Sequence, residues 1–302
     1  MLFGKKKNEK EEKNSVLKQD LSSQVNPGAV FIMSLLMKKP PEIPNKESIT
    51  EILQKYLGEV DCFAHDGKMA GVAVKKYMAE FKDASMPPQL FITGGNFDAG
   101  TINDLYRSQM WDCRNDSERI LSECNYQIIA TDMMAATLPA HDRADMLMDY
   151  LEALMELFPE CEAVYFHNSG KMFLSEQIRE HEIPKEDRFI YFAVNARLFN
   201  IQGSDSMIVD TLGMSTLFLP DLQYHFHGMD PNQVVNHAYN MASYIFANDN
   251  PIKDGDTIDS IENGEMNMAV QWQCHYEDAL IQPARQVIDV YMNEYAAGNR
   301  EY

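Results

Sequence analysis

Residues 209–258 decide the fold and read VDTLGMSTLFLPDLQYHFHGMDPNQVVNHAYNMASYIFANDNPIKDGDTI. The first half holds two apolar runs separated by Leu219-Pro220-Asp221, a pattern that predicts two strands joined by a turn. Asp230-Pro231 begins a helix, because Asp caps the first turn, Pro fits its first position and Gln233 follows three residues after the cap. We expect this helix to run to about Phe246, so the stretch predicts a strand–turn–helix–turn unit.

Outside this stretch, the hydrophobic pattern also mixes strands and helices. Residues 28–37 form an apolar run typical of a strand buried on both faces, and Asp66-Gly67 is a hairpin turn between two short strands. We expect strands at 28–37, 60–64, 69–74, 89–93, 126–130, 163–166, 189–200, 207–226 and 266–276, and helices at 46–57, 102–110, 117–124, 139–158, 173–181, 231–246 and 283–295. The predicted class is α+β, with mixed, largely antiparallel sheets, helices packed on one face and ferredoxin-like elements.

The chain has 302 residues, of which 45% are hydrophobic and 24% charged, typical of a soluble globular protein. Residues 1–26 are rich in charge, and we expect a disordered tail there, followed by a single α+β domain over 27–302 or subdomains at 27–200 and 201–302. No apolar run reaches the roughly 20 residues that cross a bilayer. The five cysteines are scattered and form no C-x-x-C pair, so we expect reduced thiols and a cytoplasmic location.

The net charge of −20 limits the classes of partner. A strongly negative protein repels nucleic acids and anionic membranes, so we expect it to bind neither. A basic protein is the partner that such a charge would attract. The plainer interpretation is that acidity keeps the protein soluble.

The predicted helix at 139–158 has one apolar face and one acidic face. Its acidic face carries Asp142, Asp145, Asp149, Glu152 and Glu156 at intervals of three or four residues. Like charges at this spacing destabilise an isolated helix by about 0.2–0.5 kcal/mol per pair. A solvated outer face is the plainer interpretation, and a docking stripe for a basic protein surface is the functional one.

Histidines near Asp221 form the second candidate site. His225 and His227 are an H-x-H pair, whose rings share a face if the segment is a strand. His237, near the start of the next helix, would complete a three-histidine set suited to zinc or another divalent metal. Surface or hydrogen-bonded histidines are the plainer interpretation, because no metalloprotease-like signature accompanies the pair.

Other motifs fall short of known catalytic or ligand-binding signatures. A calcium loop with Gly255 at its sharp turn would have Ile252 and Ile261 at two of its ligand positions, so the segment at 254–257 is expected to be a turn. The glycine-rich segment at 93–101 lacks the lysine of a phosphate loop. Ser169-Gly170-Lys171 has neither G-x-S-x-G nor S-x-x-K spacing, so an ordinary turn is expected.

Four motifs carry a family resemblance: DTLGM at 210–214, LPDLQ at 219–223, the Asp230-Pro231 helix start and DGDTI at 254–258. They resemble the bacterial family known as domain of unknown function 4261. Less specific similarity, including VYFHNSG at 164–170, extends the resemblance to about 27–290. The resemblance implies a cytosolic bacterial protein with one contiguous α+β unit, and it brings no catalytic residues.

Two functions follow from these observations. The first is a non-catalytic acidic protein-binding protein, immunity-like or regulatory, that needs no cofactor and sequesters a basic partner. The second is a metal-dependent enzyme, such as a hydrolase, that uses Asp221, His225, His227 and His237. The charge, the acidic helix and the failed catalytic motifs favour the first.

Overall fold

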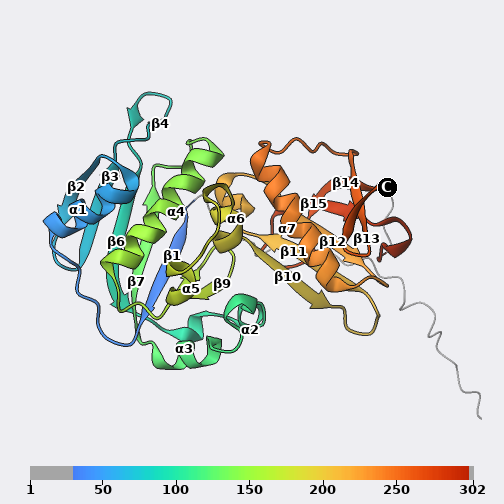
Figure 1. Ribbon diagram of the computed structural model, residues 1–302, viewed down its shortest axis with the longest axis horizontal. Coiled ribbons are helices and arrows are strands. Elements are labelled where there is room, and N and C mark those ends of the chain that lie inside the picture. Colours follow the sequence, from blue (N-terminus) through green and yellow to red (C-terminus); the bar gives the residue numbers. More distant parts are fainter. Residues whose placement is uncertain (1–29, 299–302) are drawn as a thin grey trace, which may run out of the picture.

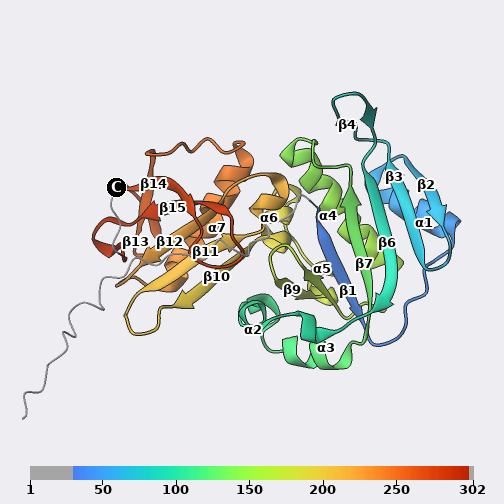
Figure 2. The same cartoon turned by 180° about the vertical axis from the view of Figure 1, so that it is seen from behind.

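The computed structural model describes residues 30–298, which form two large sheets at opposite ends of an elongated molecule (Figure 1). The α6 helix (Arg188–Ala193) lies between the sheets in both views (Figures 1 and 2). A small hairpin of β4 (Ala79–Glu80) and β5 (Ser85–Met86) stands apart from both. The predicted tail at 1–26 lies outside the described residues. Within those residues, no helix has the length and apolar character needed to span a membrane.

The first sheet has seven antiparallel strands in the order β2-β3-β6-β7-β1-β8-β9. Its strands are β1 (Ile32–Met37), β2 (Val60–His65), β3 (Met69–Val74), β6 (Gln89–Asn96), β7 (Tyr126–Met133), β8 (Ala163–Phe166) and β9 (Lys171–Leu174). β1 is hydrogen-bonded to β7 and β8, and five of its six residues are buried. The continuous apolar run therefore marks a central strand, as predicted.

Helices cover the first sheet unequally. The α1 helix (Lys46–Leu57) and the α4 helix (Ala140–Leu157) lie together on one face (Figure 1). α1 begins where the Asn45 side chain accepts a hydrogen bond from the Ser48 amide. The short helices α2 (Asp104–Arg107) and α3 (Ser117–Glu123) close a smaller core on the other face, over the end of the sheet that holds β1, β8 and β9. Figure 2 shows β2, β3 and β6 uncovered by helices on that side.

The second sheet is mixed, in the order β10-β11-β12-β15-β14-β13. Its strands are β10 (Asn195–Asn200), β11 (Met207–Leu212), β12 (Asp221–Phe226), β13 (Thr257–Glu262), β14 (Glu265–Asp278) and β15 (Gln286–Tyr291). Only the β12–β15 pair among the described strands is parallel. The α7 helix (Pro231–Ala247) packs its buried Val234, Ala238 and Ile245 on one face. These features confirm the predicted α+β class with mixed, largely antiparallel sheets.

The structure corrects two predicted elements. The expected helix at 283–295 is β15, followed by the short 3-10 turn Asn293–Tyr295. β15 lies between β12 and β14, and its Val287, Ile288 and Val290 are completely buried. β-branched residues buried on both faces favour a strand, and this tertiary setting overrides the helix-like Pro283 start. The expected strand at 189–200 begins instead as α6 and becomes β10 only at Asn195.

Smaller differences concern element length. The expected helix at 173–181 divides into β9 and the short α5 helix (Ser175–Arg179). The expected helix at 102–110 contains only the four residues of α2. The chain passes from the first large sheet to the second between β9 and β10. One buried core cluster extends across both sheets. A single domain over 27–302 stays a prediction.

Candidate functional site

The predicted acidic stripe on α4 is largely paired with cations of the same chain. The buried Arg188 guanidinium donates to Asp149 Oδ1 at 2.7 Å and to the Glu152 carboxylate. The Lys185 ammonium lies 3.2 Å from Asp145 and 3.5 Å from Asp149. Arg188 and Lys185 belong to α6 and to the 3-10 turn before it, so these elements cover part of the stripe.

The C-terminal end of the stripe is also paired. Lys55 of α1 bonds to Glu156, and the Tyr56 hydroxyl donates to the same carboxylate at 2.9 Å. The hydrogen bond from Lys55, which has the larger effect, and the one from Tyr56 hold the pKa of Glu156 below its ordinary value. Of the five predicted acids, only Asp142 has no cationic partner among the described residues. A basic partner at α4 would therefore compete with internal cations.

The four predicted metal ligands do not come together. Asp221 and His225 share a face of β12, as expected from the alternation of a strand. His237 lies on the opposite face, because its Nδ1 bonds to the hydroxyl of Tyr224, the neighbour of His225 on the strand. His227 lies beyond the end of β12 and is half-buried. No group of three His, Cys, Asp or Glu side chains within residues 30–298 is placed to hold a metal ion.

Both ring nitrogens of His237 have partners within the fold. Nδ1 is 2.9 Å from the Tyr224 hydroxyl, and Nε2 is 3.0 Å from the Asp259 carbonyl oxygen. A neutral ring satisfies both, with Nε2 donating to the carbonyl and Nδ1 accepting from the phenol. Burial lowers the pKa of His237 below its ordinary 6.5, although Asp259 opposes this shift. His237 is therefore a hydrogen-bonded core histidine that joins α7 to β13.

This lowered pKa predicts a loss of stability in acid. The unfolded chain takes up the His237 proton near pH 6.5, and the folded chain takes it up only at lower pH. The stability contributed by the neutral His237 ring is therefore fully present above about pH 6.5 and is lost as the pH falls further. We expect the His237→Gln variant to lose less stability than the wild type between pH 7.5 and 5.0, measured by urea unfolding. The exposed His65→Gln variant is the control. Equal pH dependence of the His237→Gln variant and the wild type would contradict this assignment.

A row of polar side chains crosses the second sheet on the face opposite α7. The strand register aligns Arg197, Asp210, Gln223, Asp289 and His275 on β10, β11, β12, β15 and β14. The first four are completely buried. Arg197 Nε donates to Asp210 Oδ1 at 2.8 Å, and Gln223 Nε2 donates to Asp289 Oδ1 at 2.9 Å. This row was not predicted, because register between strands far apart in the chain leaves no local signal.

Arg285 enters the polar row from the loop that precedes β15. Its Nη2 donates to Asp210 Oδ2 at 2.8 Å and its Nε to Asp221 Oδ2 at 3.1 Å. Asp221 also accepts from the Met214 amide at 3.2 Å. Burial raises the pKa of Asp221, and the Arg285 charge opposes that rise. Two guanidinium groups, Arg197 and Arg285, thus neutralise two buried carboxylates, an arrangement suited to holding strands and loop together.

The surface of the second sheet is far more acidic than its core. Residues 198–284 contain twelve Asp and Glu residues but a single Lys or Arg, Lys253. Ten of these acids are not buried: Asp205, Asp230, Asp249, Asp254, Asp256, Asp259, Glu262, Glu265, Glu277 and Asp278. None of the ten forms an ion pair with a Lys or Arg among the described residues. We call these ten residues the acidic surface.

Exposed apolar side chains lie within the acidic surface on the β13–β14 hairpin. Met266, Met268 and Val270 of β14 are 46%, 78% and 40% exposed. Glu262 ends β13 and Glu265 begins β14, on either side of the hairpin turn. β13 is also the edge strand of its sheet. Residues at this hairpin thus combine negative charge with uncovered apolar area, a combination found where proteins bind one another.

Comparison with known proteins finds a family similarity over part of the chain. A family model described as "Domain of unknown function (DUF4261)" matches residues 210–291. This segment runs from β11 to β15 and contains α7, most of the polar row and most of the acidic surface. It includes all four motifs on which the resemblance was based. No curated protein and no solved structure matches the chain.

Proposed function

We propose that this chain, which carries a DUF4261 domain at residues 210–291, is a non-catalytic binding protein whose acidic surface engages a basic protein partner. The observation that carries the proposal is the set of ten surface carboxylates without a Lys or Arg partner among the described residues. This proposal moves the docking site from α4, whose acids are paired, to the second sheet.

The β13–β14 hairpin adds exposed apolar side chains to the negative charge of the acidic surface. Complementary charges accelerate association and select the partner, but most binding energy comes from apolar groups that become buried at the centre. Met266 and Met268 offer such groups, and Glu262 and Glu265 stand beside them. Methionine side chains also adapt to partners of different shape. The expected partner therefore presents Lys or Arg around an apolar centre.

The proposal includes a location in the bacterial cytoplasm and an immunity-like or regulatory role. All five cysteines are free and buried thiols, as expected in a reducing compartment. The bacterial origin rests on the family resemblance. Sequestration of a basic protein by an acidic one requires no cofactor and no catalytic group.

Charge reversal on the hairpin tests the docking surface. The double variant Glu262→Lys/Glu265→Lys changes the net charge by +4, and Glu47→Lys/Glu51→Lys on the exposed side of α1 makes the same change on the first sheet. The probe is a synthetic 20-residue amphipathic helix of Lys and Leu, whose binding is measured by fluorescence anisotropy at 50 and 200 mM NaCl. We expect the hairpin variant to bind about tenfold more weakly, because it loses complementary charge at the contact.

The α1 variant is expected to bind within about twofold of the wild type, because its charges lie outside the docking surface and are screened by salt. An equal loss in both variants would show that only net charge matters. Unchanged binding by the hairpin variant would also contradict the proposal. The same pair of variants then serves to select partners from a bacterial extract: a true partner is basic, is lost with the hairpin variant and is retained by the α1 variant.

A further inference from the structure

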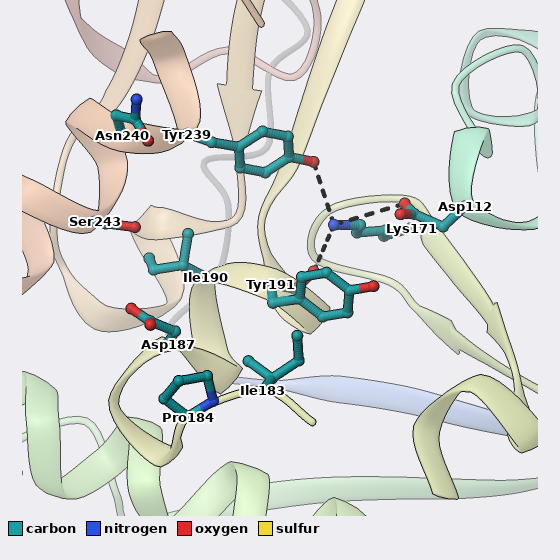
Figure 3. A pocket seen from close by; sticks show the side chains of 10 residues that line it. All are labelled: Asp112, Lys171, Ile183, Pro184, Asp187, Ile190, Tyr191, Tyr239, Asn240 and Ser243. Carbon is teal, nitrogen blue, oxygen red and sulfur yellow. Dashed lines mark hydrogen bonds and ion pairs between the residues drawn. The ribbon is translucent and has the colours of Figure 1, made fainter. Parts of the chain in front are cut away.

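A pocket of about 530 Å³ lies between the two large sheets, in a region that the proposed function does not use (Figure 3). Its lining comes from β9, α6, α7, the 3-10 turn before α6 with the two residues that precede it, and the 3-10 turn Trp111–Cys113. Ile183, Ile190 and Tyr191 supply apolar walls, and Lys171, Tyr239 and Asp187 supply polar groups. A volume of this size suits a small molecule held by a few placed polar groups.

Lys171 places a buried positive charge at one end of the pocket. Its side chain is 2% exposed. Its ammonium donates to the carbonyl oxygens of Tyr191 at 2.5 Å and Val194 at 3.1 Å, and to the Tyr239 hydroxyl at 3.2 Å. These three bonds use all its protons. The Asp112 carboxylate, 3.6 Å away, offsets part of the charge.

The Tyr239 hydroxyl is left with a proton to donate. Its oxygen accepts one hydrogen bond from Lys171 and a second from the Ala196 amide at 3.2 Å, which occupies both lone pairs. Its own proton forms no hydrogen bond within residues 30–298. A hydroxyl that accepts from a cation becomes a stronger donor. Tyr239 therefore presents a polarised O–H group to any ligand in the pocket.

Asp187 lies on the side of the pocket away from Asp112 and Lys171 (Figure 3). It is exposed, and its carboxylate has no side-chain or backbone partner among the described residues. The pocket thus offers a donor beside a positive charge at one end, a free carboxylate at the other and apolar walls at Ile183 and Ile190. The two lining carboxylates outnumber the single ammonium, so a ligand with only a negative charge is disfavoured.

We propose that this pocket binds a small zwitterion with an apolar body, namely an α-amino acid with an aliphatic or aromatic side chain. Its carboxylate accepts the hydrogen bond of Tyr239 near the Lys171 charge. Its ammonium pairs with Asp187, and its side chain lies against Ile183 and Ile190. This site is independent of the acidic surface, so either proposal stands if the other fails.

Binding of leucine and phenylalanine to the full chain, measured by calorimetry, tests this assignment. Two probes each lack one charged group of leucine: 4-methylpentanoate has no ammonium and isopentylamine has no carboxylate. We expect saturable binding of at least one amino acid and binding at least about tenfold weaker for both analogues, the loss expected when a charged contact is removed. Absence of saturation by both amino acids at 10 mM (roughly the weak limit for a specific small ligand) would overturn the proposal.

Two variants locate the ligand. Asp187→Asn is expected to weaken amino acid binding about tenfold and not to weaken the binding of 4-methylpentanoate, which has no ammonium and is repelled less once the Asp187 charge is removed. Tyr239→Phe is expected to weaken the binding of both the amino acid and 4-methylpentanoate. The control Tyr244→Phe, at an exposed position on the same helix, is expected to weaken the binding of neither. Tyr239→Phe also removes an acceptor of Lys171, so Asp187→Asn, on the surface, provides the test that does not depend on folding. Unchanged amino acid affinity in Asp187→Asn would overturn the proposal.

Discussion

Replacement of Arg285 by Met is expected to lower the free energy of unfolding by about 3–5 kcal/mol, the cost of removing one partner from a buried ion network. Arg285 is 6% exposed and contacts Asp210 and Asp221, both completely buried. Met fills much of the same volume but leaves Asp221 without a guanidinium. The carboxylate must then remain charged and unpaired in a low-dielectric environment, or take up a proton.

Urea unfolding at pH 7 measures this effect. The matched control is Lys185→Met, which removes an exposed cation from Asp145 and should cost at most about 1 kcal/mol. A loss for Arg285→Met as small as that of the control would mean that the network is not coupled to folding. Asp210→Asn provides a second test, because it removes the carboxylate shared by Arg197 and Arg285.

Replacement of Gly213 by Ala is expected to cost about 2–5 kcal/mol, from backbone strain together with overpacking. Gly213 lies in the DTLGM motif, directly after β11, and has a φ of 132°. A Cβ atom there would lie 2.4 Å from the carbonyl oxygen of Ala193 and 3.1 Å from Val194 Cα. Both are backbone atoms at the junction of α6 and β10, so neither yields by a side-chain rotation.

The control variant Gly255→Ala separates the cost of backbone strain from the cost of overpacking. Gly255 also has a positive φ, of 85°, but no atom lies within 4 Å of its would-be Cβ. The control should therefore cost only about 1–2 kcal/mol, the penalty of a left-handed conformation. Thermal or urea unfolding of both variants provides the comparison. A Gly213→Ala variant no less stable than Gly255→Ala would show that the backbone of α6 and β10 moves easily.

Elements with local signals at both ends were predictable from the sequence. The bounds of α1 match the prediction, because Asn45 caps its first turn and Gly58 follows its last residue. The Asp66-Gly67 turn likewise fixes the β2–β3 hairpin, with Gly67 at a φ of 79°. The prediction of a helix at 283–295 was wrong, since the strand conformation of β15 depends on neighbours that lie far away in the sequence. The edge strand β13, in which three of six residues are buried, was not predicted.

The sites were less predictable than the fold. Spacing on α4 revealed the acidic stripe but not Arg188, which reaches it from 39 residues away. Alternation on β12 placed Asp221 and His225 on one face, but it gave no information on the side from which α7 brings His237. Lys171 was expected to lie in an ordinary turn, and only the meeting of β9, α6 and α7 places it in a pocket. Each miss reflects a contact between distant segments, for which one sequence has no local signal.

The parallel pairing of β12 with β15 has a consequence for synthesis on the ribosome. Gln223 and its partner Asp289 are separated by 66 residues, so one edge of β12 has no neighbour until β15 leaves the exit tunnel. A nascent chain that has just released α7 therefore exposes Asp210 and Asp221 without Arg285, beside an open strand edge. We expect chaperones to engage the chain at this stage and to dissociate once β15 closes the sheet.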